Sequence, residues 1–139
     1  MRRLSAQALD VAGITALVRD PAHGAVLVFE GVARESGQVD PAAVIAHLDY
    51  EAWEGPAERA ILALESETEA RFPGARVRIV HRTGRVAIGE PAVVVAVGAP
   101  HRDVAYAASR HAIDTLKVTV PLWKKETGAD GSTWIENHP

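Results

Sequence analysis

Two nearly continuous apolar runs constrain the fold of this 139-residue chain more than any other feature. They cover residues 24–33 and 92–97, and neither shows the regular alternation of a strand with one face in water. Short apolar runs bounded by glycine or proline are typical of strands buried in a sheet. We therefore predict a central strand over residues 24–33 and a second buried strand over residues 92–97.

Helical and period-2 patterns surround these two strands. Asp10 is a suitable N-cap for a short helix that ends before Pro21, and Gly55-Pro56 opens a longer helix. The alternation of residues 44–51 predicts a half-buried strand, with one side made of Val44, Ala46, Leu48 and Tyr50. The other predicted elements are a helix over 102–118 and strands over 77–83, 85–88, 122–127 and 133–136. This order fits a single α+β domain over residues 1–139 with a mainly antiparallel sheet.

The composition excludes several classes of function. The chain has no cysteine, so it has no disulfide, no thiolate metal site and no cysteine nucleophile or persulfide. A net charge of −3 and few aromatic residues argue against a general nucleic-acid surface. No apolar run approaches the roughly 20 residues of a membrane span, and no apolar segment of a secretory signal follows Met1. We expect a cytoplasmic protein that binds neither nucleic acid nor membrane.

Three lysines gather between residues 116 and 126 of this acidic chain. Lys117 lies in the last turn of the predicted helix, where a cation that complements the helix dipole is the simpler explanation. Lys124 and Lys125 are neighbours on a predicted strand and must therefore face opposite sides. Only one of them can share a pocket with Lys117, and the pattern alone does not decide which. Such a pocket would attract an anionic partner.

Other candidate anion-binding residues lie at the ends of predicted elements. His101 and Arg102 stand where a buried strand ends and a helix begins, and the free N–H groups of a helix start attract anions. Arg34 follows the first apolar run and opens a glycine-containing loop. The pair His101-x-Asp103 is a weak indication of a metal, so we expect neither a metal nor a cofactor.

Taken together, these segments resemble the MoaE family, the large catalytic subunits of molybdopterin synthase. The most specific match is the pattern L-K-x-x-x-P-x-W-K-[KR]-E over residues 116–126. The matching segments run in family order over residues 24–34, 48–53, 80–84, 89–95, 101–102, 112–117, 120–126 and 134–136.

The resemblance implies an α/β-hammerhead fold with an additional small antiparallel sheet. It also implies a homodimer that binds a small ubiquitin-like sulfur-carrier subunit at each end, which makes a heterotetramer. The implied reaction converts cyclic pyranopterin monophosphate into molybdopterin, with sulfur from the C-terminal Gly-Gly thiocarboxylate of the carrier. A sulfurtransferase without cysteine needs such a second molecule to bring the sulfur. Two anions then meet in one pocket and repel by about 4 kcal/mol at 4 Å.

The resemblance also assigns the site. Lys117 and Lys124 match the family's essential lysines, which selects Lys124 over Lys125. We assign Lys117 to general acid/base catalysis beside the carrier terminus and Lys124 to charge stabilisation and proton transfer, and these roles are exchangeable. The implied substrate-binding set also includes the backbone of Val32 and Ala33 and the side chains of Arg34, His101, Arg102, Lys125 and Glu126. The alternatives are a non-catalytic docking module for a ubiquitin-like carrier and a stand-alone phosphate-binding enzyme, for which no nucleophile or metal set is present.

Overall fold

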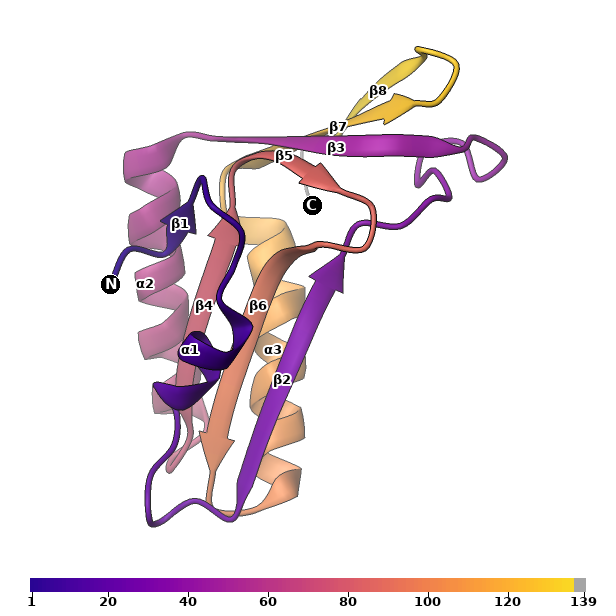
Figure 1. The fold of residues 1–139 in the computed structure, drawn as a ribbon. Helices are drawn as coiled ribbons and strands as arrows, with labels where there is room; N and C mark the ends of the chain where they lie inside the picture. Colours follow the sequence, from indigo (N-terminus) through magenta and orange to yellow (C-terminus); the bar gives the residue numbers. More distant parts are fainter. Residues whose placement is uncertain (137–139) are drawn as a thin grey trace.

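The computed structural model describes residues 1–136, which form two four-stranded sheets and three helices (Figure 1). The main sheet runs in the order β1 (Leu4–Ser5), β4 (Arg76–Arg82), β6 (Pro91–Ala99) and β2 (Ala25–Val32). The upper sheet runs in the order β5 (Gly84–Ala87), β3 (Ile45–Ala52), β7 (Leu122–Gly128) and β8 (Thr133–Glu136). All strand pairs are antiparallel except β1 with β4. The predicted α+β class, with a mainly antiparallel sheet and a second small one, is confirmed.

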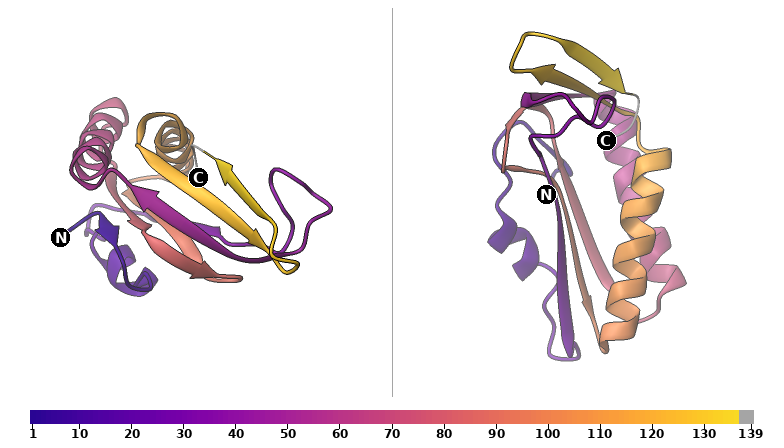
Figure 2. Two further views of the ribbon diagram at one scale, coloured as in Figure 1. Left: turned by 90° about the horizontal axis from the view of Figure 1, so that it is seen from above. Right: turned by 90° about the vertical axis from the view of Figure 1, so that its right-hand side faces the viewer.

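The three helices cover the two faces of the main sheet. The long helices α2 (Glu54–Arg71) and α3 (Arg102–Thr119) lie on one face, and the short helix α1 (Val11–Ala16) lies on the other (Figures 1 and 2). As predicted, Asp10 caps α1, because its carboxylate accepts the backbone N–H of Gly13 at 3.0 Å. No helix within residues 1–136 combines the length and apolar character that a bilayer span requires.

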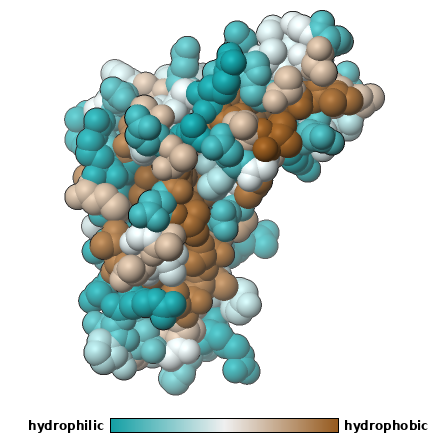
Figure 3. Space-filling view, viewed as in Figure 1, coloured by the Kyte–Doolittle hydropathy of each residue, from teal (hydrophilic) through white to brown (hydrophobic). Residues whose placement is uncertain are grey.

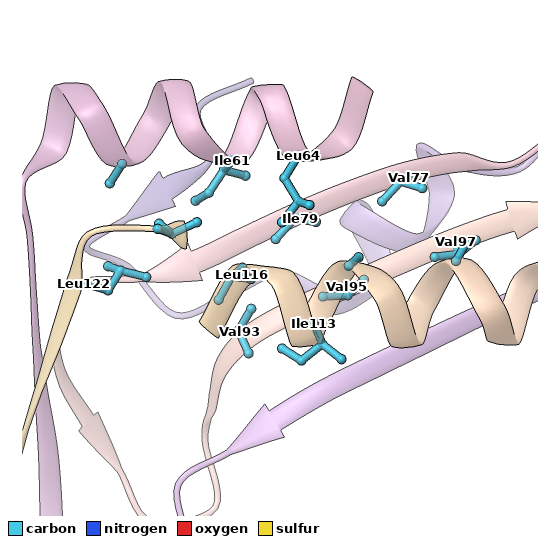
Figure 4. Close-up of a cluster of buried hydrophobic side chains, with 14 of the residues drawn as sticks. Ile61, Leu64, Val77, Ile79, Val93, Val95, Val97, Ile113, Leu116 and Leu122 are labelled. Carbon is cyan, nitrogen blue, oxygen red and sulfur yellow. The ribbon is translucent and has the colours of Figure 1, made fainter. Parts of the chain in front are cut away.

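The main core lies between the two long helices and the main sheet. Figure 4 shows Ile61 and Leu64 of α2 and Leu116 of α3 pointing toward the apolar side chains of β4 and β6. The predicted helix over 102–118 is present as α3, and its buried apolar face consists of Ala105, Ala108, Ala112, Ile113 and Leu116. The core therefore fixes both the position of α3 along the sheet and its rotation about its own axis.

The two apolar runs occupy different places in the main sheet. The run over residues 92–97 lies in β6, which has a strand on each side and is buried throughout, as predicted. The prediction that residues 24–33 form a central strand is wrong, because β2 is an edge strand paired with β6 alone in the described structure. Phe29 and Val32 of β2 are 38% and 46% exposed. Figure 3 shows hydrophobic atoms gathered along β2 and beneath the projecting upper sheet. The run over residues 24–33 therefore contributes to an exposed apolar surface as well as to the core.

The strand β3 departs from the simple alternation that its sequence predicts. Leu48 and Tyr50 are buried on the inner face, as expected. The pairing with β7 shifts between Ile45 and His47, and this irregularity buries Ile45 and leaves Val44 61% exposed. A β-bulge moves the residues before it to the opposite face, which explains the failure at the first half of this segment.

No pattern in the sequence predicts β1, which is two residues long. A buried ion pair holds this segment, because Arg3 Nε lies 2.7 Å from Glu65 Oε2 on α2. The same carboxylate oxygen accepts the backbone N–H of Ile79 on β4 at 2.8 Å. Glu65 therefore joins the N-terminus, α2 and the main sheet at one buried point.

His81, near the end of β4, lies at the junction of the two sheets. Its ring is fully buried and packs edge-on against Tyr50 of β3, with the ring centroids 4.8 Å apart. Nδ1 lies 2.7 Å from the carbonyl oxygen of Arg82. Burial lowers the pKa of His81 to about 4 and keeps the ring neutral in the folded protein.

We predict that His81 makes the fold sensitive to mild acid. Between pH 6.5 and pH 4 the unfolded chain takes up a proton at this histidine and the folded chain does not, so stability falls as the pH is lowered. The free energy of unfolding in urea should drop by about 2 kcal/mol from this group alone between pH 7 and pH 4.5. The variant His81→Leu should lack that portion of the slope, whereas the exposed-site variant His101→Leu should keep it. Equal slopes in both variants would contradict the assignment.

Candidate active site

A cavity of about 340 Å³ lies where the main sheet, the upper sheet and the C-terminal half of α3 meet. Its apolar walls come from β2, β6, α3 and β3, and include Phe29, Val93, Ile113 and Leu48. Its polar lining consists of Arg34, Gln38, Tyr50, Lys117, Lys124 and Glu126. The structure thus brings Arg34, Lys117 and Lys124 together from three separate segments of the chain.

The core determines which lysine of β7 enters this cavity. Leu122 is fully buried at the start of the strand, and the alternation that follows also buries Lys124 and Glu126. Trp123 and Lys125 point to the opposite, exposed face. The structure therefore places Lys124 in the cavity and Lys125 outside it, because successive side chains of a strand face opposite ways. The prediction that Lys125 lines the pocket is not met within this chain.

Lys124 is buried but has polar partners on two sides. Its side chain is 5% exposed, and its ammonium lies 3.3 Å from Glu136 Oε2 on the paired strand β8. The ammonium also donates a hydrogen bond to the side-chain oxygen of Gln38. A buried cation is tolerated when its charge and its donors are satisfied in this way.

Glu126 and Tyr50 share the inner face with Lys124. The Glu126 carboxylate is buried and accepts the backbone N–H of Gln38 at 3.1 and 3.2 Å. Burial, and then the charges of Glu126 and Glu136, raise the pKa of Tyr50 well above its ordinary value. Tyr50 therefore stays a neutral phenol at physiological pH.

The end of β2 places Arg34 at the cavity. Ala33 is buried and held by two backbone bonds, one to the carbonyl oxygen of Glu90 at 3.0 Å and one from the N–H of Gly89 at 2.8 Å. Val32 and Arg34, on either side of it, line the cavity, whereas Ala33 supports the wall from behind. The strand end is therefore fixed while the arginine side chain remains exposed.

His101 and Arg102 lie far from this cavity within the chain. They stand at the N-terminus of α3, and its 18 residues place that end about 27 Å from the Lys117 end. There they border a separate surface hollow with Gly24, Pro100 and Asp103. One chain alone therefore does not bring the two parts of the predicted anion-binding set together.

Sequence reasoning missed Gln38, Tyr50 and Glu136 as members of the site. The Asp130-Gly131 pair between the predicted strands over 122–127 and 133–136 was a usable signal for Glu136, because Asp-Gly favours a hairpin turn and this hairpin sets Lys124 opposite Glu136. Tyr50 lay in the alternating pattern of β3, whose pairing with Lys124 on β7 depends on a long-range register. Gln38 comes from an irregular loop, for which the sequence carried no signal.

The comparisons with known proteins agree on one family. The model of the MoaE protein family matches residues 4–119. A molybdopterin synthase catalytic subunit from Nostoc sp. is 44% identical over 129 residues, which are 91% of this chain and 76% of that protein. The crystal structure of molybdopterin synthase from Staphylococcus aureus superposes with a TM-score of 0.91 at 32% identity, covering 99% of this chain and 97% of that one. A complex of subunits 1 and 2 of the molybdopterin-converting factor from Helicobacter pylori shares the fold, with a TM-score of 0.76 at 19% identity and coverage of 99% and 92%.

We predict that the carboxylates of the cavity act on Tyr50. Replacing Glu126 with glutamine removes one of the two charges that raise the Tyr50 pKa, so that pKa should fall while burial keeps it above the ordinary value. Alkaline titration of the tyrosinate absorbance measures this change, and Tyr50→Phe identifies the Tyr50 component. An unchanged Tyr50 titration in Glu126→Gln would show that the carboxylate does not reach the phenol.

Proposed function

The chain belongs to the MoaE family of molybdopterin synthase catalytic subunits, and we propose how its cavity carries out the sulfur transfer. The sulfur donor is the C-terminal thiocarboxylate of a small ubiquitin-like carrier subunit, and the acceptor is cyclic pyranopterin monophosphate. The product is the dithiolene of molybdopterin. The observation that carries this proposal is the convergence of Arg34, Lys117 and Lys124 on one cavity in a chain without cysteine.

The cavity suits a reaction in which two anions must lie close together. The carrier terminus and the substrate phosphate repel each other, and cations around a partly buried space offset that repulsion. In each transfer the thiocarboxylate sulfur bonds to a pterin carbon, and water then cleaves the carrier's C–S bond and leaves a carboxylate, so negative charge shifts within the cavity. Fixed positive groups that already point at this charge stabilise it without further rearrangement.

The two lysines differ in ways that fit two roles. Lys124 is buried and held by Glu136 and Gln38, so it suits the stabilisation of developing charge. Lys117 is exposed on the last turn of α3 and borders the same cavity. A side chain that can move between solvent and the reacting groups suits general acid/base catalysis beside the carrier terminus.

A second copy of the chain accounts for His101 and Arg102. The edge strand β2 begins beside them, because the N–H of Gly24 donates to the carbonyl oxygens of Ala99 and Pro100. It ends at Val32, two residues before Arg34, and its eight residues span about 27 Å, close to the length of α3. We propose that the β2 strands of two copies pair antiparallel about a twofold axis, which sets the start of one strand beside the end of the other.

This pairing would bring His101 and Arg102 of one copy to the Arg34 end of its partner. The upper sheet projects beyond β2 (Figure 1) and leaves a hollow beneath it (Figure 3), into which the lower part of the partner would fit. It would also cover the apolar surface along β2, with its exposed Phe29 and Val32. The carrier would then complete a heterotetramer, with one carrier subunit at each end of the dimer.

We predict that both cavity lysines are needed for turnover. The protein is mixed with a thiocarboxylated carrier and the pterin precursor, and molybdopterin is measured. Lys117→Ala and Lys124→Ala should each reduce the rate by about 100-fold or more. Lys125→Ala, which alters the neighbour on the opposite face of β7, should retain turnover. Wild-type rates in both cavity variants would remove the catalytic assignment.

We predict that the complete site contains residues from two copies. Lys117→Ala and Arg102→Ala chains, co-expressed with different tags and purified as mixed dimers, should regain about half of the wild-type activity, because one of the two sites then has both residues. Mixed dimers of Lys117→Ala with Lys124→Ala should stay inactive, since both changes lie in the cavity of the same chain and leave each site one lysine short. Absence of any recovery in the first pair would show that Arg102 acts in the cavity of its own chain and not in that of its partner.

A further inference from the structure

A single glutamine ties the loop between β2 and β3 to the charged side of the cavity. The loop has its own internal bonds, with Ser36 bridged to Val44 and the N–H of Gly37 donating to the carbonyl oxygen of Ala43 at 3.2 Å. Gln38 joins this loop to β7 twice. Its backbone N–H donates to the carboxylate of Glu126, and its side-chain oxygen accepts from the ammonium of Lys124.

The two partners of Lys124 are not equivalent. Glu136 is held opposite Lys124 by the backbone pairing of β7 and β8, and it carries a full negative charge. Gln38 is neutral and comes from an irregular loop. Both hydrogen bonds have the charged ammonium as donor, but only the one to Glu136 adds the Coulomb attraction between opposite charges. An anion that enters the cavity therefore competes more easily with Gln38 than with Glu136.

The surroundings of Lys124 explain why its ammonium needs a neutral hydrogen-bond acceptor while the cavity is empty. The ammonium contacts Glu136, and Lys124 shares the inner face of the upper sheet with Glu126 and Tyr50. Lys124 also lines the cavity together with Arg34 and Lys117. A buried ammonium without an acceptor on the cavity side would leave a donor unsatisfied, at a cost in stability. The amide oxygen of Gln38 supplies that acceptor without adding a negative charge that would repel anionic ligands.

We propose that Gln38 is a positioning residue, and that an anionic ligand displaces its side chain from the ammonium of Lys124. In the empty cavity its amide oxygen holds the Lys124 ammonium in place, and an anionic oxygen or sulfur of the ligand takes over that position. Displacement frees the side chain of Gln38, while its backbone bond to Glu126 keeps the loop in register. The inference rests on the proposed function in one respect, namely that an anion enters this cavity.

The first test measures anion binding by a variant that lacks the competing oxygen. Gln38→Met has a side chain of similar length without an acceptor, and it keeps the backbone N–H that Glu126 accepts. Inorganic phosphate and thioacetate are titrated separately by nuclear magnetic resonance, as probes for the two kinds of anion. Gln38→Met should bind at least one of them about three- to tenfold more tightly than wild type, because the ligand no longer displaces a hydrogen bond. Gln7→Met, a change of an exposed glutamine far along the chain, should bind as wild type does.

A double-variant cycle links the effect to Lys124. In the Lys124→Met background, adding Gln38→Met should leave the affinity for both probes unchanged, since the bond in question is already absent. Equal or weaker binding of both probes by Gln38→Met in the wild-type background would overturn the proposal. Gln38 would then be a fixed support of Lys124 and not a group that gives way.

A second measurement uses the wild-type chain and needs no variant to fold. With glutamine selectively labelled with nitrogen-15, the anion that binds Gln38→Met more tightly should shift the side-chain amide signals of Gln38 and leave those of Gln7 in place. Unmoved Gln38 signals at saturating anion would contradict displacement. Neither measurement requires the carrier or turnover, so a failure to form molybdopterin would count against the proposed function and leave this result intact.

Discussion

The burial of charge on the inner face of β7 is the constraint on which the site depends. Leu122 enters the core, and the alternation of the strand then commits Lys124 and Glu126 to the same buried side. A charge removed from water costs several kcal/mol unless partners compensate it. The hairpin with β8 supplies Glu136 and the β2–β3 loop supplies Gln38, so both neighbouring segments are tied to these two residues.

The short connection between α3 and β7 brings Lys117 and Lys124 to the same cavity. Leu116 and Leu122 are both fully buried, and Pro121 lies between them where the helix ends and the strand begins. Lys117 follows the first leucine and Lys124 lies two residues after the second. Because both leucines are fixed in one core, the two lysines reach the same cavity from different layers of the fold. Their positions thus follow from apolar packing, and the chemistry uses what the core has already fixed.

The sequence predicted the elements well and their neighbours less well. The helix over 102–118, the cap at Asp10 and the strands over 122–127 and 133–136 depend on local patterns, and all of them are present. The run over residues 24–33 resembled that of β6 because both are apolar. Its place at the sheet edge depends on which strand lies beside it, and periodicity does not contain that information. The alternation predicted for residues 44–51 failed near Ile45 for the same reason, because the bulge there depends on the pairing with β7.

The sequence likewise predicted some residues of the candidate site and missed others. Because neighbouring residues of a strand face opposite sides, the local pattern allowed either Lys124 or Lys125 to enter the pocket. The family resemblance selected Lys124. The site roles of Tyr50 and Glu136 follow from cross-strand pairs. Gln38 comes from a loop whose partners on β7 lie 86 and 88 residues later in the sequence. Such contacts depend on tertiary structure, so an analysis of motifs finds the cations and misses the groups that hold them.

The charge balance of the cavity argues that one chain is not sufficient for two anionic ligands. Arg34, Lys117 and Lys124 face the carboxylates of Glu126 and Glu136, which leaves a single net positive charge. A thiocarboxylate and a cyclic phosphate bring one negative charge each, so an uncompensated anion would remain in a partly buried space. The proposed twofold pairing of β2 would add Arg102 of the second copy at the Arg34 end and restore neutrality. The proposed pairing would therefore cover the exposed apolar edge and supply the second positive charge with one and the same surface.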